Sequence, residues 1–350
     1  MCFVSDDRMV SVLCQHVYKV LIIVVLALVL IEFTFSVLNE THYATPFLTP
    51  NYTSPFMPSS MMYLNLTASQ KLGDNSTTAI AQFCPVIPPN LQGPLKIYKE
   101  AFSLDVLQDK LKSLELELGG THRPQNCIAL FRVAIIVPYR DRVHHLHLFL
   151  YNIHPMLVRQ QLDYTIFIVE QEEGQTFNRA SLFNVGFVEA NKIREFDCFI
   201  FHDVDLIPED DRNLYTCPGM PRHMSVAVDS LNYKLPYASI FGGVCALSKE
   251  HFQKVNGFSN EYWGWGGEDD DMSMRLKLNG LNIIRYPPDI AKYTMLKHRK
   301  EKANPQRYEK LYSGNKRYKK DGLNSLQYRV VDAKQEKLFT WFLVQLGAVS

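Results

Sequence analysis

Short apolar segments alternate with amphipathic segments over residues 133–205. Residues 133–140, 164–171 and 198–205 have the length and bulky apolar composition of buried strands. Between them, residues 142–154 and 179–192 repeat apolar side chains at helical spacing, and Pro155 stands where the first of these helices is expected to end. Strand, helix, strand, helix, strand is typical of a doubly wound sheet, so the pattern predicts an α/β fold.

In such a fold, ligands bind beyond the carboxyl ends of the strands. The third predicted strand ends in "FIFHDVDL", and alternation along a strand would put Asp203 and Asp205 on one side of the chain. Paired carboxylates suit Mn²⁺ or Mg²⁺ holding a diphosphate, and Arg140 and Arg142 in "PYRDR" can neutralise phosphate. The alternatives are a solvated loop for the two aspartates and surface ion pairs for the two arginines.

The ten residues "YWGWGGEDDD" (262–271) thread aromatic side chains with glycines and then place four carboxylates in a row. The glycines allow the loop to hinge, and Trp263 and Trp265 can cover the face of a sugar ring. The acids open a predicted helix for which Gly280 is a suitable C-terminal cap. Acids in a first helical turn also complement the helix dipole, and this alternative applies most to Asp271.

The N-terminal part of the chain predicts a membrane anchor. Val20–Ile31 is an unbroken apolar run, and residues 17–38 together approach the roughly 20 residues that a bilayer needs. Lys19 precedes the run, and the next Lys or Arg is Lys71, so residues 1–16 are expected in the cytosol. A cleaved signal peptide is the alternative, although no small-residue cleavage motif follows the run. Residues 39–83 are then expected to form a stem and residues 84–350 a luminal catalytic domain.

Glycosylation motifs and cysteines agree with this orientation. All four Asn-x-Ser/Thr sites fall in the predicted stem, at Asn39, Asn51, Asn65 and Asn75. Five cysteines would be luminal, an odd number; Cys245 lies in an apolar run and is expected to be buried, and the other four can form two disulfides. The formal net charge of +1 argues against nucleic acid as a partner.

Several of these segments resemble the β-1,4-galactosyltransferase family of Golgi enzymes. The resemblance rests on "FHDVDLIP", "FGGV", "YWGWGGEDDD", "NPQR" and "DGLNSL" and runs from about Cys84 to residue 335. It implies a type II Golgi membrane protein with a glycosyltransferase-A fold, a mixed Rossmann-like sheet flanked by helices. It further implies an inverting, Mn²⁺-dependent transfer from a UDP-sugar donor to a GlcNAc-terminated acceptor on protein or lipid.

The resemblance also implies roles for individual residues. Asp269 would be the catalytic base, and the metal ligands would be Asp205, Met295 and His298, although a thioether is a poor ligand for a hard ion. Cys84–Cys127 and Cys198–Cys217 would be the disulfides. The donor-binding residues would be Pro138, Tyr139, Arg140, Arg142, Phe177, Asn178, Arg179, Val204, Asp205, Trp265 and His298. The acceptor-binding residues would be Gly267, Glu268, Asp269, Asp270 and Arg307.

The donor sugar is expected to depend on Ile240, which precedes Phe-Gly-Gly where the vertebrate galactosyltransferases carry a tyrosine. The shorter, apolar side chain leaves room for an N-acetyl group, as in the β-1,4-N-acetylgalactosaminyltransferase branch of the family, so UDP-GalNAc is the expected donor and UDP-Gal the alternative. Two other classes of function remain: a catalytically inactive membrane lectin, and an unrelated metallohydrolase. Asp205, His298 and Asp269 are all present, which disfavours the first, and the chain has no HExxH-like spacing, which disfavours the second.

Overall fold

The computed structural model describes residues 19–31, 82–298 and 302–347. Residues 19–31 are helical, and among the described residues no helix is long and apolar enough to cross a membrane. The rest of the predicted anchor, 17–38, and all four predicted glycosylation sites lie outside the described residues. Contacts divide the chain into two compact units, residues 1–43 and residues 44–350.

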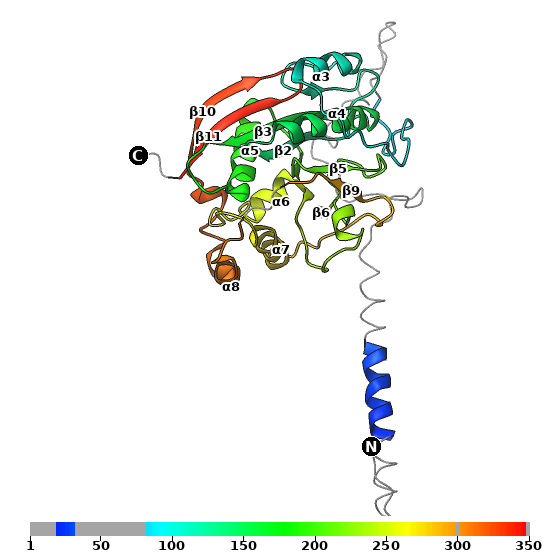
Figure 1. Cartoon of the computed structure of the whole chain (residues 1–350), viewed down its shortest axis with the longest axis vertical. Helices are drawn as coiled ribbons and strands as arrows, with labels where there is room; N and C mark the ends of the chain where they lie inside the picture. The colour runs from blue at the N-terminus through cyan, green and yellow to red at the C-terminus, as the bar shows by residue number, and fades with distance from the viewer. Residues whose placement is uncertain (1–18, 32–81, 299–301, 348–350) are drawn as a thin grey trace, which may run out of the picture. The chain divides into compact units, whose positions relative to one another are not determined.

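A mixed sheet of eight strands forms the centre of the second unit (Figure 1). Its order is β10-β11-β3-β2-β4-β8-β6, and β1 pairs with β3. Strands β11, β3, β2 and β4 run parallel, whereas β8, β6, β10 and β1 pair antiparallel with their neighbours. The eight strands are β1 (Thr121–His122), β2 (Arg132–Tyr139), β3 (Asp163–Gln171), β4 (Cys198–His202), β6 (Arg222–His223), β8 (Val244–Ser248), β10 (Tyr328–Gln335) and β11 (Thr340–Leu346).

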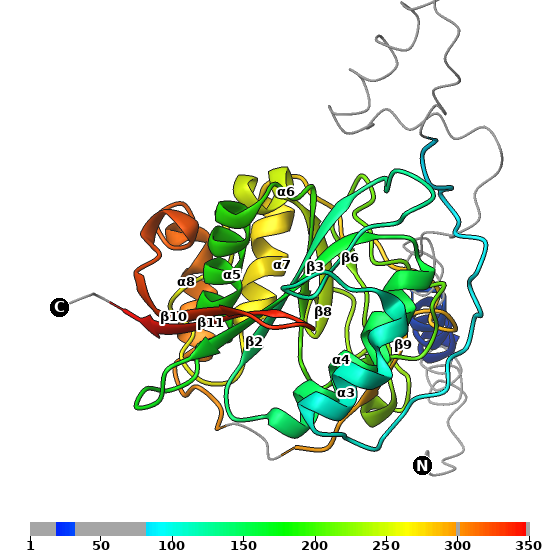
Figure 2. The same ribbon diagram turned by 90° about the horizontal axis from the view of Figure 1, so that it is seen from above.

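Helices cover both faces of this sheet (Figure 2). Along β2, Val133, Ile135 and Val137 pack with α3 and α4, while Ala134 and Ile136 pack with α5, α6 and α7. This is the two-residue period of a strand that is buried on both faces, so the predicted α/β fold is confirmed. The helices are α3 (Leu104–Lys110), α4 (Val143–Arg159), α5 (Arg179–Ile193), α6 (Lys249–Lys254), α7 (Glu268–Leu278) and α8 (Arg307–Arg317), with 3-10 turns at Lys112–Leu114, Asp229–Leu231 and Leu323–Ser325.

Two predicted boundaries are wrong. Helix α4 continues through Pro155 to Arg159, because the buried residues Ile153, Met156 and Leu157 hold its last turns against the sheet. The packing of this face offsets the backbone hydrogen bond that a proline removes. Strand β4 ends at His202, and Asp203–Asp205 lie in a turn instead of the strand. The alternation argument for the two aspartates therefore does not apply.

A second, three-stranded sheet in the order β5-β9-β7 stands beside the first. It consists of β5 (Leu206–Pro208), β9 (Lys292–Met295) and β7 (Ala227–Val228). Because β5 begins directly after Asp205 and pairs antiparallel with β9, segments that are far apart in the sequence meet at one edge of the large sheet.

Both predicted disulfides are present. Cys84–Cys127 joins the start of the described domain to the segment before β2, and Cys198–Cys217 joins the first residue of β4 to the loop that precedes β6. Cys245, on β8, is a free and buried cysteine, as expected. Disulfides of this kind persist in oxidising compartments, which agrees with a luminal domain.

Candidate active site

The candidate site lies where strands and helices converge at the carboxyl ends of β2 and β4. The two strands are parallel neighbours, and they end at Tyr139 and His202. Helix α5 begins with Arg179, and helix α7 begins with Glu268. A salt bridge joins these two first residues, so both helix N-termini face one region. The ligand-binding rule for α/β sheets predicted this location.

Arg179 connects three elements at this place. Its Nε donates to Asp203 Oδ1 at 2.5 Å, Nη1 lies 3.4 Å from Glu268 Oε1, and Nη2 lies 3.4 Å from the carbonyl oxygen of Gly243. The guanidinium also stacks 4.5 Å from the ring centre of Phe183. The side chain of Arg179 therefore holds the chain after β4, the start of β8 and the start of α7 together. The resemblance assigned Arg179 to donor binding, yet here it contacts Glu268, which the resemblance assigned to acceptor binding.

Asp205 and His298 meet through the pairing of the small sheet. Leu206 stands opposite Met295, and the backbone N–H of Leu296 donates to the carbonyl of Asp205 at 2.7 Å. This register brings His298 Nε2 to 2.9 Å from Asp205 Oδ2, and Arg142 Nη1 lies 3.5 Å from the same oxygen. Burial favours a neutral carboxyl, but the hydrogen bond from His298 and the charges of His298 and Arg142 outweigh it and lower the pKa of Asp205.

These residues fit a divalent cation. The carboxylate of Asp205 and the imidazole of His298 lie within hydrogen-bonding distance of each other. Met295, which carries the thioether, pairs with Leu206, the residue directly after Asp205. Met295 accepts from Ser230 Oγ at 3.3 Å through sulfur, and Asp229 Oδ1 accepts from its backbone N–H. No group of three His, Cys, Asp or Glu side chains with metal-binding geometry occurs within the described ranges.

Asp203 has a different partner from Asp205. The turn after β4 directs Asp203 to Arg179, whereas Asp205 meets His298 and Arg142. The backbone N–H of Asp203 also donates to the carbonyl of Gly243. The two carboxylates therefore serve separate purposes: Asp203 anchors Arg179, and Asp205 faces the predicted metal ligands.

The four acids of α7 lie in different environments. Glu268 is buried, and burial together with the charge of Asp269 raises its pKa. Asp269 lies against the backbone of Gly242, where an added Cβ would come within 2.5 Å of Asp269 Oδ2. Burial and the neighbouring carboxylate of Asp270 raise the pKa of Asp269, which brings it nearer to the range of a useful general base. Asp270 accepts from Tyr237 Oη at 2.9 Å.

The glycine-rich loop before α7 separates the two tryptophans. Gly264, Gly266 and Gly267 all have positive φ angles, which other residues rarely adopt. Trp265 is 59% exposed, and its backbone pairs with Ala303. Trp263 instead packs against the core cluster that includes α5 and α7. Only Trp265 of the pair therefore remains suited to covering a sugar face.

Other predicted donor and acceptor residues surround this centre. Arg140 donates to the carbonyl of Gln175 at 2.7 Å and stacks on Phe177. Asn178 is buried and caps α5 by accepting from the Ser181 N–H, so its side chain is engaged within the protein. Pro138 and Tyr139 are the last buried residues of β2, and Val204, within the turn after β4, is also buried. Arg307 begins α8, with its guanidinium 5.9 Å from the ring centre of Trp265 and 4.5 Å from that of Tyr308.

Sequence reasoning missed the residues that hold the loop containing Ile240. Arg285 Nη2 donates to the carbonyls of Ala238 and Ile240, each at 2.8 Å, and Arg285 Nε donates to His223 Nδ1. Burial and the charge of Arg285 lower the pKa of His223 to about 3, so the neutral ring donates from Nε2 to the carbonyl of Gly242. His223 and Arg285 lie 62 positions apart, and no local motif indicates that they meet.

Two family models match most of the described second unit. The N-terminal region of glycosyl transferase group 7 matches residues 84–218, and the N-terminal domain of galactosyltransferase matches residues 222–299. β-1,4-Galactosyltransferase 4 of Cricetulus griseus is 44% identical over 81% of this chain and 84% of its own. β-1,4-Galactosyltransferase 2 of the same species is 46% identical over 77% of this chain and 74% of its own.

Among solved structures, the chain is similar to the catalytic domain of Drosophila β-1,4-galactosyltransferase 7 in complex with xylobiose. The TM-score is 0.55 at 31% identity, over 62% of this chain and 95% of that one. A mutant of the same enzyme in complex with manganese, UDP-Gal and xylobiose gives a TM-score of 0.54 at 30% identity, with the same coverage.

We expect Arg179→Gln to destabilise the protein by about 3 kcal/mol at pH 8, because it leaves the buried Glu268 and the partly buried Asp203 without their cation. Burial raises the pKa of Asp203 and Glu268 even beside Arg179, and both pKa values rise further without it. The folded state then binds more protons than the unfolded state, so the loss of stability is smaller at pH 5 than at pH 8. Urea unfolding at both pH values measures this.

Arg132→Gln is the matched control for this change. Arg132 holds Asp197 at 2.7 Å, but its side chain is 38% exposed. Its charge and hydrogen bonds lower the pKa of Asp197 although burial opposes them. In the wild type that contribution is complete above the unfolded pKa of about 4, and without Arg132 the burial of Asp197 acts on a single, partly exposed carboxyl, so the loss should differ less between pH 5 and pH 8 than it does for Arg179→Gln. An equal loss at both pH values for Arg179→Gln would contradict the role given to Arg179.

Proposed function

The chain belongs to the β-1,4-galactosyltransferase family and is a glycosyltransferase, and from this premise we propose that it transfers galactose from UDP-Gal to the 4-hydroxyl of a terminal GlcNAc. The observation that carries the proposal is the convergence of two groups at one sheet edge. Asp205, His298 and Arg142 offer a place for a cation and a diphosphate, and Asp269 offers a carboxylate with a raised pKa.

The choice of UDP-Gal rests on the relatives. Curated relatives at 44–47% identity are β-1,4-galactosyltransferases, and the similar Drosophila enzyme has been seen with UDP-Gal and manganese. This favours UDP-Gal over the UDP-GalNAc that was expected from Ile240. That expectation depended on a single side chain, which is half-buried in a loop whose main chain is held by Arg285. UDP-GalNAc is the second candidate donor, because the side chain of Ile240 is shorter than a tyrosine and leaves room for an N-acetyl group.

The proposed mechanism is a single in-line displacement with inversion. The 4-hydroxyl oxygen of the acceptor forms a bond to the anomeric carbon of galactose while the bond from that carbon to the UDP oxygen breaks. Asp269 takes the hydroxyl proton, and Glu268, Asp270 and Arg307 orient the acceptor. Arg140 and Arg142 lie on the donor side to hold the diphosphate. Mn²⁺ held by Asp205, Met295 and His298 would neutralise charge on the departing diphosphate.

We further propose the cellular setting that the sequence predicts. Residues 17–38 would anchor the chain in the Golgi membrane as a single-pass type II protein, with residues 39–83 as a glycosylated stem. The acceptor would be a GlcNAc-terminated glycan on a protein or lipid. The two disulfides support an oxidising lumen for the catalytic domain.

The donor is tested by measuring kcat/KM for UDP-Gal and UDP-GalNAc with Mn²⁺ and a GlcNAc-terminated acceptor. We expect UDP-Gal to be preferred, and Ile240→Tyr to reduce the use of UDP-GalNAc further by crowding the N-acetyl group. Arg285 bonds the backbone of this loop, so changing the side chain of residue 240 should leave the loop in place. A tenfold preference for UDP-GalNAc would overturn the donor assignment, and acceptor binding without transfer from either donor would indicate a lectin.

We expect Asp269→Asn to reduce kcat by on the order of 100-fold or more, because it removes the base while keeping the shape of the side chain. Binding of UDP with Mn²⁺, measured by calorimetry, should change little. In the wild type, kcat/KM should fall at low pH with an inflection above the ordinary Asp pKa, and Asp270→Asn should move that inflection lower because the carboxylate of Asp270 raises the pKa of Asp269. Substantial turnover by Asp269→Asn would exclude it as the base.

Asp205→Ala and His298→Ala should each raise the Mn²⁺ concentration needed for half-maximal activity by at least about tenfold, since each removes one protein ligand. Direct Mn²⁺ binding, followed by water proton relaxation, should weaken in parallel. Glu209→Gln is the control, because Glu209 lies beside the same strand pair but accepts hydrogen bonds from Thr294 and Tyr233, which are not proposed ligands. Unchanged Mn²⁺ titrations for both alanine variants would remove these residues from the metal site.

A further inference from the structure

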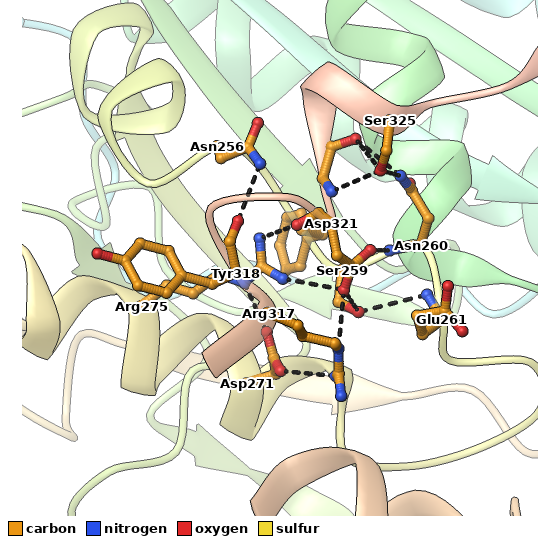
Figure 3. Close-up of polar contacts among 12 residues, drawn as sticks. Asn256, Ser259, Asn260, Glu261, Asp271, Arg275, Arg317, Tyr318, Asp321 and Ser325 are labelled. Carbon is orange, nitrogen blue, oxygen red and sulfur yellow. Dashed lines mark hydrogen bonds and ion pairs between the residues drawn. The ribbon is translucent and has the colours of Figure 1, made fainter. Parts of the chain in front are cut away.

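Four charged side chains form a closed ring of ion pairs between α7 and the C-terminal end of α8 (Figure 3). This charge quartet consists of Asp271 and Arg275 on α7, Arg317 at the end of α8, and Asp321 just after it. Arg275 Nε donates to Asp271 Oδ1 at 2.5 Å, and Arg317 Nη2 lies 3.2 Å from Asp271 Oδ2. Asp321 Oδ2 lies 3.3 Å from Arg275 Nη2 and 3.0 Å from Arg317 Nε.

The surrounding chain completes the hydrogen bonding of the quartet. Asp321 also accepts from Ser259 Oγ and from the backbone N–H of Asn260, and Asp271 Oδ2 accepts from Tyr262 Oη. Arg275 and Asp271 have no exposed surface. Burying charges costs free energy unless they are paired and fully hydrogen-bonded, and apolar packing would join two helices at no greater cost. Unlike apolar packing, hydrogen-bonded ion pairs are directional, so they fix the relative orientation of the two helices as well as the distance between them.

The two helices approach closely at the quartet. A Cβ added to Gly314 of α8 would lie 2.6 Å from Asp271 Oδ2 and 2.8 Å from the Met274 methyl carbon. Gly314 therefore has no room for a larger side chain, although glycine disfavours a helix interior. The close approach and the ionic contacts fix the same pair of elements.

The N-terminal ends of these two helices carry the proposed acceptor-binding residues. Asp271 follows Glu268, Asp269 and Asp270 in the first turn of α7, and Arg307 is the first residue of α8. Arg307 is about 15 Å along the helix axis from Arg317, at 1.5 Å per residue. A helix moves as a rigid rod over this length, so a rotation of α8 at the quartet displaces Arg307 relative to the three acids.

We propose that the charge quartet is a positioning device for acceptor binding: it holds α8 against α7 so that Arg307 faces Glu268–Asp270. The inference rests on the proposed function, since it takes these residues as the acceptor site. Arg317 and Gly314 are positioning residues, because they act on the acceptor through the placement of α8. Most of the donor side is built from β2, α5 and the β5–β9 pair, and it meets α8 at Trp265, whose ring centre lies 5.9 Å from the guanidinium of Arg307.

Two variants test this by different routes. Arg317→Met removes one cation from the quartet, and Gly314→Ala keeps all four charges but forces α8 away from Asp271. We expect each to raise the acceptor KM by about tenfold, since small displacements of binding groups have large effects, while KM for UDP-Gal stays within about twofold. Arg317→Lys should recover part of the loss. Asn315→Ala, at an exposed neighbouring position on α8, should leave both constants unchanged.

Thermal unfolding of each variant separates positioning from stability. Alanine favours a helix more than glycine does, so Gly314→Ala remains informative if Arg317→Met fails to fold. Equal increases in both KM values, or wild-type KM values in Gly314→Ala despite a lower Tm, would overturn the positioning role. A wild-type protein that transfers no sugar to a GlcNAc acceptor would instead overturn the proposed function, and the inference with it.

Discussion

The contact between Arg179 and its two carboxylates is the interaction on which the site depends. Arg179 begins α5, Asp203 follows β4 and Glu268 begins α7, so three elements meet at one guanidinium. A charged group that is largely buried loses stabilising free energy when its partner leaves, so a shift of any one of the three elements is disfavoured. The cation thereby joins the donor side, where the turn after β4 leads to Asp205, to the acidic helix on the acceptor side.

The metal-facing residues depend on a different constraint, which is strand register. Asp205 and Met295 meet because β5 pairs with β9, with Leu206 opposite Met295. A slip of one residue would turn every side chain of a strand to its other face, so this register decides whether Met295 and His298 can approach Asp205. Sequence chemistry alone would have placed Met295 in the core, since a thioether is a soft ligand; the family resemblance singled it out, and the strand pairing puts it beside Asp205.

The features that could be predicted from the sequence are local ones. The periods of β2, α4, β3, α5 and β4 are visible in their own residues, and the family motifs marked the acids of α7. Two local predictions were wrong. Pro155 does not end α4, and β4 ends at His202, three residues before the predicted end of that strand. Other features join segments that are distant in the sequence, so the hydrophobic periodicity of one segment cannot predict them. They are the pairing of β11 with β3, the contact of Arg285 with His223, and the charge quartet.

The four consecutive acids of α7 show how such distant contacts create one reactive group. Glu268 is paired with Arg179, Asp270 accepts from Tyr237, and Asp271 is held between Arg275 and Arg317. Asp269 instead receives the backbone N–H of Asp270 and lies against Gly242. A helix N-terminus normally favours the charged form of a carboxylate, but here burial and the adjacent carboxylate raise the pKa of Asp269. Burial also raises the pKa of Glu268 and Asp271, but those two carboxylates are held in salt bridges by Arg179, Arg275 and Arg317. The raised pKa of Asp269 therefore belongs to the acid whose carboxylate is not engaged in any of these three salt bridges.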